Sequence, residues 1–300
     1  MLLAPGILLK TSSGKLRRSD CRERYRRGDY RIRAPWWQLT RLLLKTTVPL
    51  LRRFRRTAGN HLFAGYALAT GLVLAALAFA SILLLPGLER RWHALHRLTR
   101  LWAWLTRTPL RVTGLEQLPA TGPCVLVANH ASYLDAFVML ATLRQPISFV
   151  AKEELRDNLL LRTLLERLAV QYVNRQDPEQ SLTDARSTLL RVQQGGRLLF
   201  FPEGTLQDSP GLMPFKMGAF ACAAETGAPL IPVAIQGTRS ILRGQRWYGY
   251  RGEIGLVIGA PVPVPSENLD SSDAWSRALA LRKAARTHIL EHCREPDLAR

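Results

Sequence analysis

Residues 62–85, LFAGYALATGLVLAALAFASILLL, form an apolar run of 24 positions without a charged side chain. As an α-helix, a run of this length rises far enough to cross the roughly 30 Å hydrocarbon core of a bilayer. A buried helix in a soluble core does not need so many consecutive apolar residues. The run therefore predicts a membrane helix, and it restricts the rest of the chain to folds that can be attached to a bilayer.

The net charge of +19 would suggest a nucleic-acid partner if it were spread over the chain. It is instead concentrated beside the apolar run, since residues 1–111 contain 22 Lys and Arg against 4 Asp and Glu. Basic segments next to a bilayer are attracted to anionic lipid. We therefore expect a membrane as partner and no nucleic acid.

The segment before the apolar run predicts a second kind of membrane contact. Residues 36–56 mix Trp, Leu and Val with Arg and Lys, which is typical of a helix lying in the membrane interface, with an interruption expected at Pro49. Arginines flank the apolar run on both sides, so the positive-inside rule gives no orientation. The run could cross the bilayer, enter and return, or lie in a single leaflet.

From about residue 109 onward, short β-like runs alternate with amphipathic segments. The expected strands are 124–129, 146–151, 170–174, 197–202, 230–235 and 253–259. This alternation predicts an α/β domain with a mostly parallel or mixed sheet and helices on both faces. We expect three parts, namely a basic segment at 1–33, membrane-associated helices at 34–107 that include the hydrophobic helix 62–85, and the α/β domain at 108–300.

The segment ANHASYLD, residues 128–135, places a His and an Asp directly after the first of these strands. Ser132 and Asp135 match a capping box, in which Asp135 only stabilises the start of a helix. His130 and Asp135 equally match a catalytic dyad, in which the carboxylate orients the imidazole and leaves one ring nitrogen for a substrate. The two interpretations are compatible, because both need a strand-to-helix turn, where α/β folds present reactive groups.

Polar residues follow two other expected strands in the same way. FFPEGT, residues 200–205, presents Glu203 after a proline that ends the strand, and Gly204 allows backbone to approach a ligand closely. Arg175 follows the strand VQYVN, where it would suit bidentate binding of a phosphate. The alternative for each is an ordinary surface residue. The strand LIPVAI could line an acyl groove or belong to the core.

Taken in order, these segments resemble the four sequence blocks of the glycerolipid acyltransferase superfamily, of the 1-acylglycerol-3-phosphate O-acyltransferase type. The resemblance covers about 105–265, and the matching segments are HASYLD (130–135), YVNR (172–175), FPEGT (201–205) and IPV (231–233). AKEEL (151–155) and FKMGAF (215–220) also look like the family. Asn174 stands where an Asp is common, which bears on the choice of acceptor.

The resemblance implies that His130 acts as general base on an acceptor hydroxyl, that Asp135 orients the imidazole, and that the hydroxyl attacks an acyl thioester directly. Acyl-CoA or acyl carrier protein would be the donor, and a lysophospholipid, first of all 1-acylglycerol-3-phosphate, the acceptor. Neither a metal nor an organic cofactor is implied. The residues that it assigns to substrate binding are Lys152, Arg175, Glu203, Gly204 and Thr205.

Two alternatives to this function remain. The same chemistry could serve another acceptor, such as lysophosphatidylethanolamine or an ornithine-type lipid. The chain could also be a catalytically silent, lipid-binding membrane scaffold, although the intact pair of His130 and Asp135 argues against silence.

Residues 8–25, LLKTSSGKLRRSDCRERY, resemble the C-terminal end of a fatty-acyl-AMP ligase, in which the residue at Lys15 contacts the acyl adenylate. No adenylating domain precedes them, so we expect no such activity. We interpret residues 1–30 as a fusion remnant or the product of a misplaced start, with a chance basic tail as the alternative. The resemblance hints at an acyl carrier protein as donor.

Four scattered cysteines, without a CxxC pair, are typical of reduced thiols in a cytoplasmic domain. No cleavable signal peptide is visible before the first long apolar run. We therefore expect the chain in the inner membrane, with its catalytic domain on the cytoplasmic side.

Overall fold

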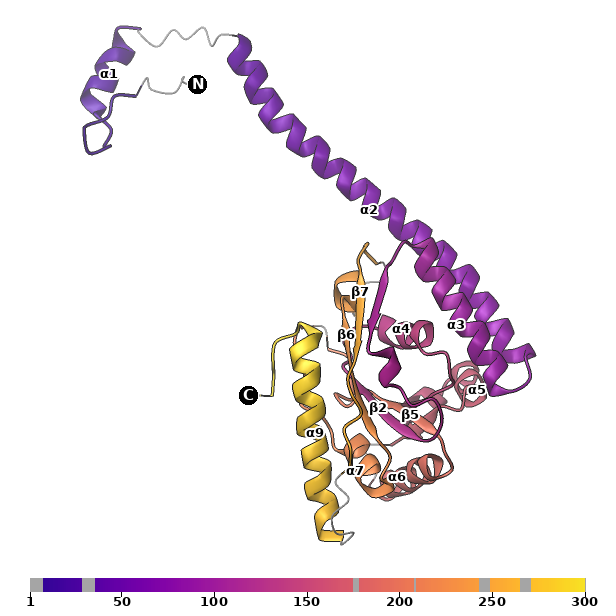
Figure 1. Ribbon diagram of the computed structural model, residues 1–300. Coiled ribbons are helices and arrows are strands. Elements are labelled where there is room, and N and C mark those ends of the chain that lie inside the picture. The colour runs from indigo at the N-terminus through magenta and orange to yellow at the C-terminus, as the bar shows by residue number, and fades with distance from the viewer. Residues whose placement is uncertain are drawn as a thin grey trace. The chain divides into compact units, whose positions relative to one another are not determined.

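The structure, a computed structural model, describes residues 8–28, 36–174, 178–207, 209–242, 249–264 and 271–299 (Figure 1). The chain divides into two compact units, Met1–Gly59 and Asn60–Arg300. The second unit contains the sheet, and most of the predicted site residues lie in its described part.

The first unit contains a turn, helix α1 (Arg18–Arg26) and the first part of helix α2 (Trp36–Leu84). In the turn, the main-chain N–H of Thr11 donates to the carbonyl of Lys15 over 2.8 Å. The turn is followed directly by α1. The resemblance of this segment to the end of a fatty-acyl-AMP ligase stays a prediction.

Helix α2 continues through Pro49, so the expected interruption there is wrong. Proline has a backbone φ that fits a helix, and it removes a single N–H donor. Leu and Arg residues after Pro49 favour a helix, and in the turn before it the hydroxyls of Thr46 and Thr47 both donate to the carbonyl of Leu43.

In the second unit, the last part of α2 pairs with α3 (Leu88–Leu105). The Tyr66 hydroxyl donates to the carbonyl of Leu105 over 3.2 Å, and the indole N–H of Trp102 donates to the carbonyl of Ala67 over 3.2 Å. The Cα of Gly71 lies so near Trp102 that an added Cβ would sit 3.3 Å from its ring. Residues 60–105 therefore form a helical hairpin, and we call them the apolar hairpin below.

Seven described strands form one sheet with the order β1-β7-β6-β2-β5-β3-β4. Their bounds are β1 Leu110–Thr113, β2 Cys124–Ala128, β3 Ser148–Lys152, β4 Gln171–Val173, β5 Arg197–Phe200, β6 Leu230–Gln236 and β7 Ile254–Ile258. Among these strands, β6 and β7 pair antiparallel and the other neighbours pair parallel. The expected mixed α/β sheet is thereby confirmed, and β1 is the strand that the sequence pattern missed.

Helices cover both faces of the sheet (Figure 1). The apolar hairpin and α4 (Leu134–Thr142) pack on one face, where Leu126 and Met139 belong to the same buried cluster. On the other face, α6 (Pro178–Gln193), α7 (Gly218–Thr226) and α9 (Ser271–Cys293) pack against Val125 and Val127. The remaining helices are α5 (Leu159–Arg167), α8 (Thr238–Ile241) and the short 3-10 helices Leu115–Gln117 and Glu153–Arg156.

The central strands determine where the site can form. β2, β5, β3 and β4 are consecutive parallel neighbours, so their carboxyl ends meet at one edge of the sheet. His130, Glu203 and Lys152 follow or end three of these strands, and the loop after β4 begins at the same edge. β6 is also parallel to β2, so the residues after Gln236 join this edge as well.

Candidate functional site at the carboxyl ends of the strands

His130 and Asp135 are in direct contact between β2 and α4. Nδ1 of His130 lies 2.9 Å from Oδ2 of Asp135. The Asp135 side chain is fully buried, whereas the His130 side chain is 21% exposed. A carboxylate accepts hydrogen bonds, so Nδ1 is the nitrogen that donates to Asp135, and in a neutral imidazole the lone pair is then on Nε2. The imidazole is thus held as a base whose free nitrogen faces away from Asp135.

Only part of the predicted capping box forms beside the contact of His130 with Asp135, because Tyr133 and not Ser132 is the N-cap residue of α4. Oδ2 of Asp135 also accepts the main-chain N–H groups of Ala131, over 2.7 Å, and of Ser132, over 2.8 Å. The Ser132 hydroxyl accepts the N–H of Leu134 over 3.2 Å, which supports the turn that precedes the helix. One carboxylate oxygen therefore starts the helix and orients the imidazole at once.

Asn129 fixes the chain immediately before His130. Its side-chain amide donates to the carbonyl of Ile235 over 3.0 Å and accepts the N–H of Ile235 over 2.7 Å. These two bonds continue the β2–β6 ladder by one step beyond the Ala128–Val233 pair. The sequence reasoning did not assign Asn129, although an Asn at a buried strand end is a recognisable signal for such a bond.

Glu203 is 4% exposed, and its two carboxylate oxygens accept hydrogen bonds from two different segments of main chain. Its Oε1 accepts the N–H of His130 over 2.6 Å, and its Oε2 accepts the N–H of Met213 over 2.9 Å. Burial raises the pKa of this carboxyl, while the two N–H donors oppose that rise. The imidazole of His130 also stacks on the ring of Phe201, with 4.3 Å between the ring centroids. The FFPEGT segment therefore supports His130 from two directions.

The other predicted binding residues lie at the same sheet edge, with one exception. Gly204 is buried with φ +79°, a backbone conformation that favours glycine. Thr205 and Lys152 are exposed to solvent. Lys152 pairs with Val173 in the β3–β4 ladder, so the ends of these two strands lie side by side. Arg175 lies outside the residues that the structure describes.

Comparison with known proteins places this arrangement in a family. The family model described as Acyltransferase matches residues 109–236, a range that includes His130, Asp135 and Glu203. A chloroplastic 1-acyl-sn-glycerol-3-phosphate acyltransferase of Brassica napus is 32% identical over 206 residues, which cover 67% of this chain and 59% of that protein. The chain belongs to the glycerolipid acyltransferase superfamily.

Two further matches extend the comparison. The 1-acyl-sn-glycerol-3-phosphate acyltransferase beta of Homo sapiens is 26% identical over 183 residues, 61% of this chain and 65% of that protein. The chain thus spans less than two thirds of either of these relatives. The crystal structure of the 1-acyl-sn-glycerophosphate acyltransferase from Thermotoga maritima superposes with a TM-score of 0.60 at 21% identity, over 78% of this chain and 97% of that one, so the two share a fold.

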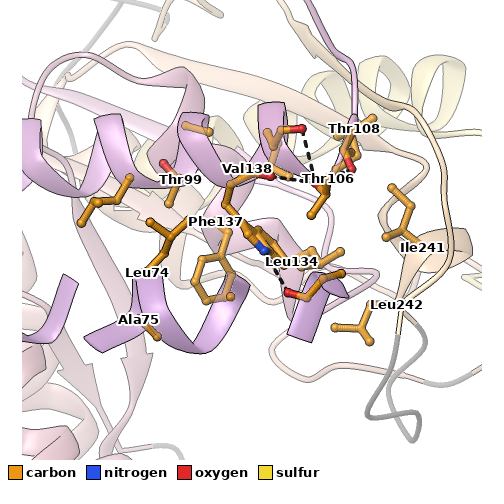
Figure 2. Close-up of a pocket in the computed structure, with 18 of the residues that line it drawn as sticks. Leu74, Ala75, Thr99, Thr106, Thr108, Leu134, Phe137, Val138, Ile241 and Leu242 are labelled. Atoms are coloured by element: carbon orange, nitrogen blue, oxygen red, sulfur yellow. Dashed lines mark hydrogen bonds between the residues drawn. The ribbon is translucent and has the colours of Figure 1, made fainter. Parts of the chain in front are cut away.

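An apolar cavity of about 360 Å³ is lined by side chains of several elements (Figure 2). It is formed within the second unit by α2, α3, α4 and the residues after α8. Leu134, which lines it, directly precedes Asp135, and Leu242, which also lines it, accepts the Ser132 hydroxyl through its carbonyl over 2.7 Å. The cavity and the His130 turn therefore share a wall.

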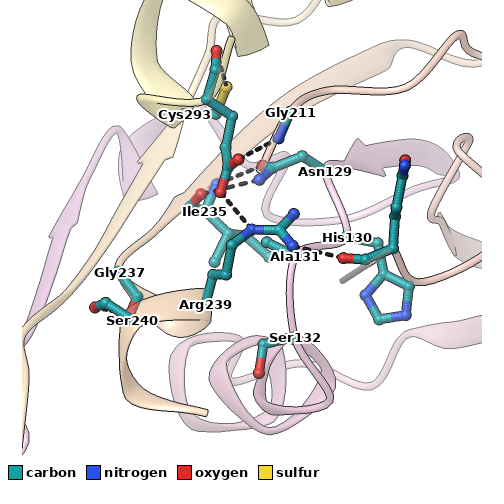
Figure 3. A network of polar contacts seen from close by, with 12 residues as sticks. Asn129, His130, Ala131, Ser132, Gly211, Ile235, Gly237, Arg239, Ser240 and Cys293 are labelled. Carbon is teal, nitrogen blue, oxygen red and sulfur yellow. Dashed lines mark hydrogen bonds and ion pairs between the residues drawn. The ribbon is translucent and has the colours of Figure 1, made fainter. Parts of the chain in front are cut away.

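A partly buried ion pair lies at the same edge and was not predicted from the sequence. Nε of Arg239 lies 2.7 Å from Oε1 of Glu295, and both side chains are 12% exposed (Figure 3). Arg239 follows β6, and Glu295 follows α9. No residue spacing links two charges so far apart in sequence, so only the folded chain reveals the pair.

The buried thiols of Cys124 and Cys222 do not offer a second nucleophile. Burial raises the pKa of Cys124 to about 11 and that of Cys222 to about 12, so both stay protonated at neutral pH. Within the described ranges, no group of three or more His, Cys, Asp or Glu side chains could hold a metal ion.

Proposed function

We propose that this chain is an O-acyltransferase that moves a fatty acyl group from a thioester to the hydroxyl of a lysophospholipid, with 1-acylglycerol-3-phosphate as the foremost acceptor. The observation that carries the proposal is the contact of His130 with buried Asp135 at the carboxyl end of a central parallel strand. The names of the relatives support the choice of acceptor.

The geometry supports a direct transfer. Nε2 of His130 takes the proton of the acceptor hydroxyl while the hydroxyl oxygen attacks the carbonyl carbon of the thioester. The carbon–sulfur bond then breaks, and the thiolate leaves with the proton from the imidazolium. Asp135 stabilises the positive charge that the imidazole carries between these steps. Because burial raises the pKa values of the Cys124 and Cys222 thiols, these two thiols are poor nucleophiles, and the acyl group passes directly to the acceptor.

The predicted binding residues divide into two roles in this proposal. Lys152 and Thr205, which are exposed at the edge beside His130, contact the phosphate end of the acceptor together with Arg175. Glu203 has both oxygens engaged with main-chain N–H groups, so we assign it the positioning of His130. Gly204 keeps the turn after Glu203 free of a side chain.

The apolar cavity would hold an acyl chain. Its lining is almost wholly aliphatic and aromatic, and its wall adjoins the turn that carries His130. An acyl chain held there would direct the thioester or glycerol end of its molecule toward His130. The reaction between the two substrates would then take place between groups that are already positioned, which lowers its entropic cost. We therefore propose that this cavity selects the acyl length.

The apolar hairpin would contact the membrane from one side. Its α2 part contacts the catalytic unit near both ends, through Arg251 over the ring of Phe63 and through the bond from Arg167 to the carbonyl of Leu83. Between these two contacts the apolar helix is largely unburied, as expected of a helix that meets lipid. Its outer face exposes apolar side chains, which are Leu62, Tyr66, Val73, Leu77 and Leu84. We propose that this face sinks into a single leaflet, with the catalytic domain on the cytoplasmic side.

The first part of α2 has the composition of an interfacial helix. At 100° per residue, cations occupy one side, and apolar side chains lie roughly 180° away. Arg41, Lys45 and Arg52 lie on one side, and Leu43, Leu50 and Phe54 lie opposite them, all of them exposed, whereas the exposed Arg53 and Val48 depart from this division. Anionic vesicles should therefore bind the chain more tightly than neutral ones, and the preference should fall in high salt.

The proposal is tested by acyl transfer in membranes that contain the full chain, read by mass spectrometry. A panel of lysolipids is offered with acyl-CoA or with acyl carrier protein as donor, and wild type is compared with H130A. The matched control is H93A, because His93 is exposed and its Nδ1 contacts a carbonyl of its own helix, that of Glu89.

We expect one acceptor to be consumed by wild type and H93A and spared by H130A. Consumption of lysophosphatidylethanolamine or of an ornithine-type lipid alone would keep the chemistry and change the acceptor. Equal turnover by wild type and H130A would refute the role of His130, and no turnover with either donor would favour a silent lipid-binding scaffold.

A further inference from the structure

Residues 295–298, which follow α9, pair with residues 211–213, which follow the FFPEGT segment. The N–H of Leu212 donates to the carbonyl of Pro296 over 2.8 Å, and the N–H of Leu298 donates to the carbonyl of Leu212 over 3.1 Å. The two segments thereby form a parallel bridge, and the Leu212 side chain is buried in the core beneath it. The loop after Glu203 is thus held against a segment more than 80 residues further along the chain.

Arg286, on α9, ties the two segments together. Its Nη1 donates to the carbonyl of Met213 over 2.6 Å, and its Nη2 donates to the carbonyl of Leu212 over 3.1 Å and to Oδ1 of Asp297 over 2.6 Å. The guanidinium carbon also lies 4.9 Å from the centroid of the Phe215 ring. One partly buried cation therefore makes charge-assisted contact with both segments.

Glu295 and Arg239 form a second tie at the start of the same pairing. Oε2 of Glu295 accepts the N–H of Gly211 over 2.5 Å, and Oε1 accepts Nε of Arg239. Arg239 in turn donates from Nη1 to the carbonyl of Gln207 over 2.5 Å, and Figure 3 shows these contacts as dashed lines. The loop is consequently held at Gln207, at Gly211 and at the two residues after Gly211.

The fixed loop reaches the catalytic turn through a single side chain. The N–H of Met213 donates to Oε2 of Glu203, and Oε1 of Glu203 accepts the N–H of His130. A continuous path of hydrogen bonds therefore runs from residues 295–298 to the main chain of His130. The path matters because a displacement of about 1 Å at a reacting group can cost on the order of 100-fold in rate.

We propose that residues 295–298 are a positioning element of the active site. With Arg239 and Arg286 they fix residues 211–213, which fix Glu203 and, through it, the main chain of His130. The inference rests on the acyl transfer proposed above and adds a remote segment to that site. Glu295 and Asp297 are positioning residues, because they act on His130 through other groups.

The test compares kcat, KM and melting temperature for the full chain and its variants, with the assay run well below the lowest melting temperature. In E295A and D297A we expect kcat to fall about tenfold with KM unchanged, as when a reacting group is misplaced. D297N should recover most of the rate, because its amide oxygen still accepts from Arg286. E295Q should recover part, because one oxygen must serve the two donors Arg239 and Gly211.

The matched control is E253Q, which removes a carboxylate that pairs with Arg111 at the β1–β7 edge of the sheet. Its kcat should equal that of wild type.

A double variant tests whether residue 295 and Glu203 act through the same hydrogen bonds. If residue 295 acts through Glu203, the kcat of E203Q/E295A falls no further than that of E203Q alone, because the two changes break one chain of contacts.

Amide hydrogen exchange gives a readout that needs no substrate. We expect exchange at His130 and Met213 to be faster in E295A than in wild type, and unchanged in E253Q. Retained kcat in E295A and D297A, or additive losses in the double variant, would overturn the positioning role and leave acyl transfer standing. If wild type turns over no lysolipid, acyl transfer fails instead, and unchanged exchange at His130 in E295A would still overturn the positioning role.

Discussion

The turn that carries His130 and the apolar cavity beside it share a wall, yet they are held together by different forces. Around the turn, Asn129, Asp135 and Glu203 each make two or more directional hydrogen bonds to main chain. Around the cavity, the hydroxyl of Thr99 bonds within its own helix and the indole N–H of Trp102 bonds to the carbonyl of Ala67 on the facing helix, but most of the lining side chains are apolar. Directional bonds fix the position of a base, whereas apolar packing fixes only a shape. Changes in the first region should therefore cost rate, and changes in the second should alter the choice of acyl chain.

The largest effect is expected at Asp135. D135A should lower kcat by about 10²–10⁴-fold, the usual contribution of a positioned acid–base group. It should also lower stability, by about 1–3 kcal/mol for each buried N–H that loses its acceptor at Ala131 and Ser132. Steady-state kinetics and thermal unfolding of the same preparation measure both quantities.

D135N separates these two losses. Its amide oxygen can still accept main-chain N–H groups, so stability should largely recover, but a neutral side chain does not stabilise the imidazolium and kcat should stay low. If D135N were as active as wild type, Asp135 would be a helix cap and no more.

A smaller effect is expected in the cavity. Ala75 of α2 lines it, and A75F should shorten it. We expect kcat/KM for long acyl chains to fall about tenfold, with short chains unaffected, in line with the discrimination of one or a few methylenes in an apolar pocket. Competition between acyl donors of different length measures this preference.

Ala76 supplies the matched comparison, because it is the next residue on the same helix and does not line the cavity. A76F should leave the preference for acyl length as it is in wild type. A uniform loss of rate for all chain lengths in A75F would mean that the two regions are not separable.

The smallest effect concerns the pH dependence of stability. Burial raises the pKa of Glu203, so between its unfolded and folded pKa values the folded state binds the proton more tightly than the unfolded chain does. The ionised carboxylate therefore costs stability as pH rises through that window. The melting temperature of wild type minus that of E203Q should decrease, by a few degrees, from mildly acidic to neutral pH.

Scanning calorimetry at several pH values measures that difference. A difference that grew with pH would mean that the N–H bonds from His130 and Met213 outweigh burial.

The sequence predicted what depends on near neighbours in the chain. His130 and Asp135 are five residues apart, so the turn between a strand and a helix is enough to bring them together. The alternating pattern predicted six of the strands, because strands covered on both faces are almost entirely apolar. β1 was missed because it has only four residues, which alternate between partly buried and exposed, so that it lacks the apolar run of the other strands.

What the sequence could not provide is the pairing of distant segments. That Glu203 holds the main chain of His130 depends on β5 lying next to β2, which follows from the order of the strands. That Arg239 meets Glu295 depends on how α9 crosses the sheet. The apolar hairpin shows the same limit, because the composition of residues 62–85 predicts a membrane helix but does not predict which residues of the α/β part contact its two ends.

The path from residues 295–298 to His130 also has a consequence for the newly made protein. During synthesis the dyad can form as soon as β2 and α4 have emerged, because its two members are close in the chain. The bonds that fix Glu203 from the far side must wait until α9 and the residues after it have left the ribosome. A nascent chain would then expose its apolar hairpin to lipid while its catalytic turn is still loosely held, so that membrane attachment precedes the onset of catalysis.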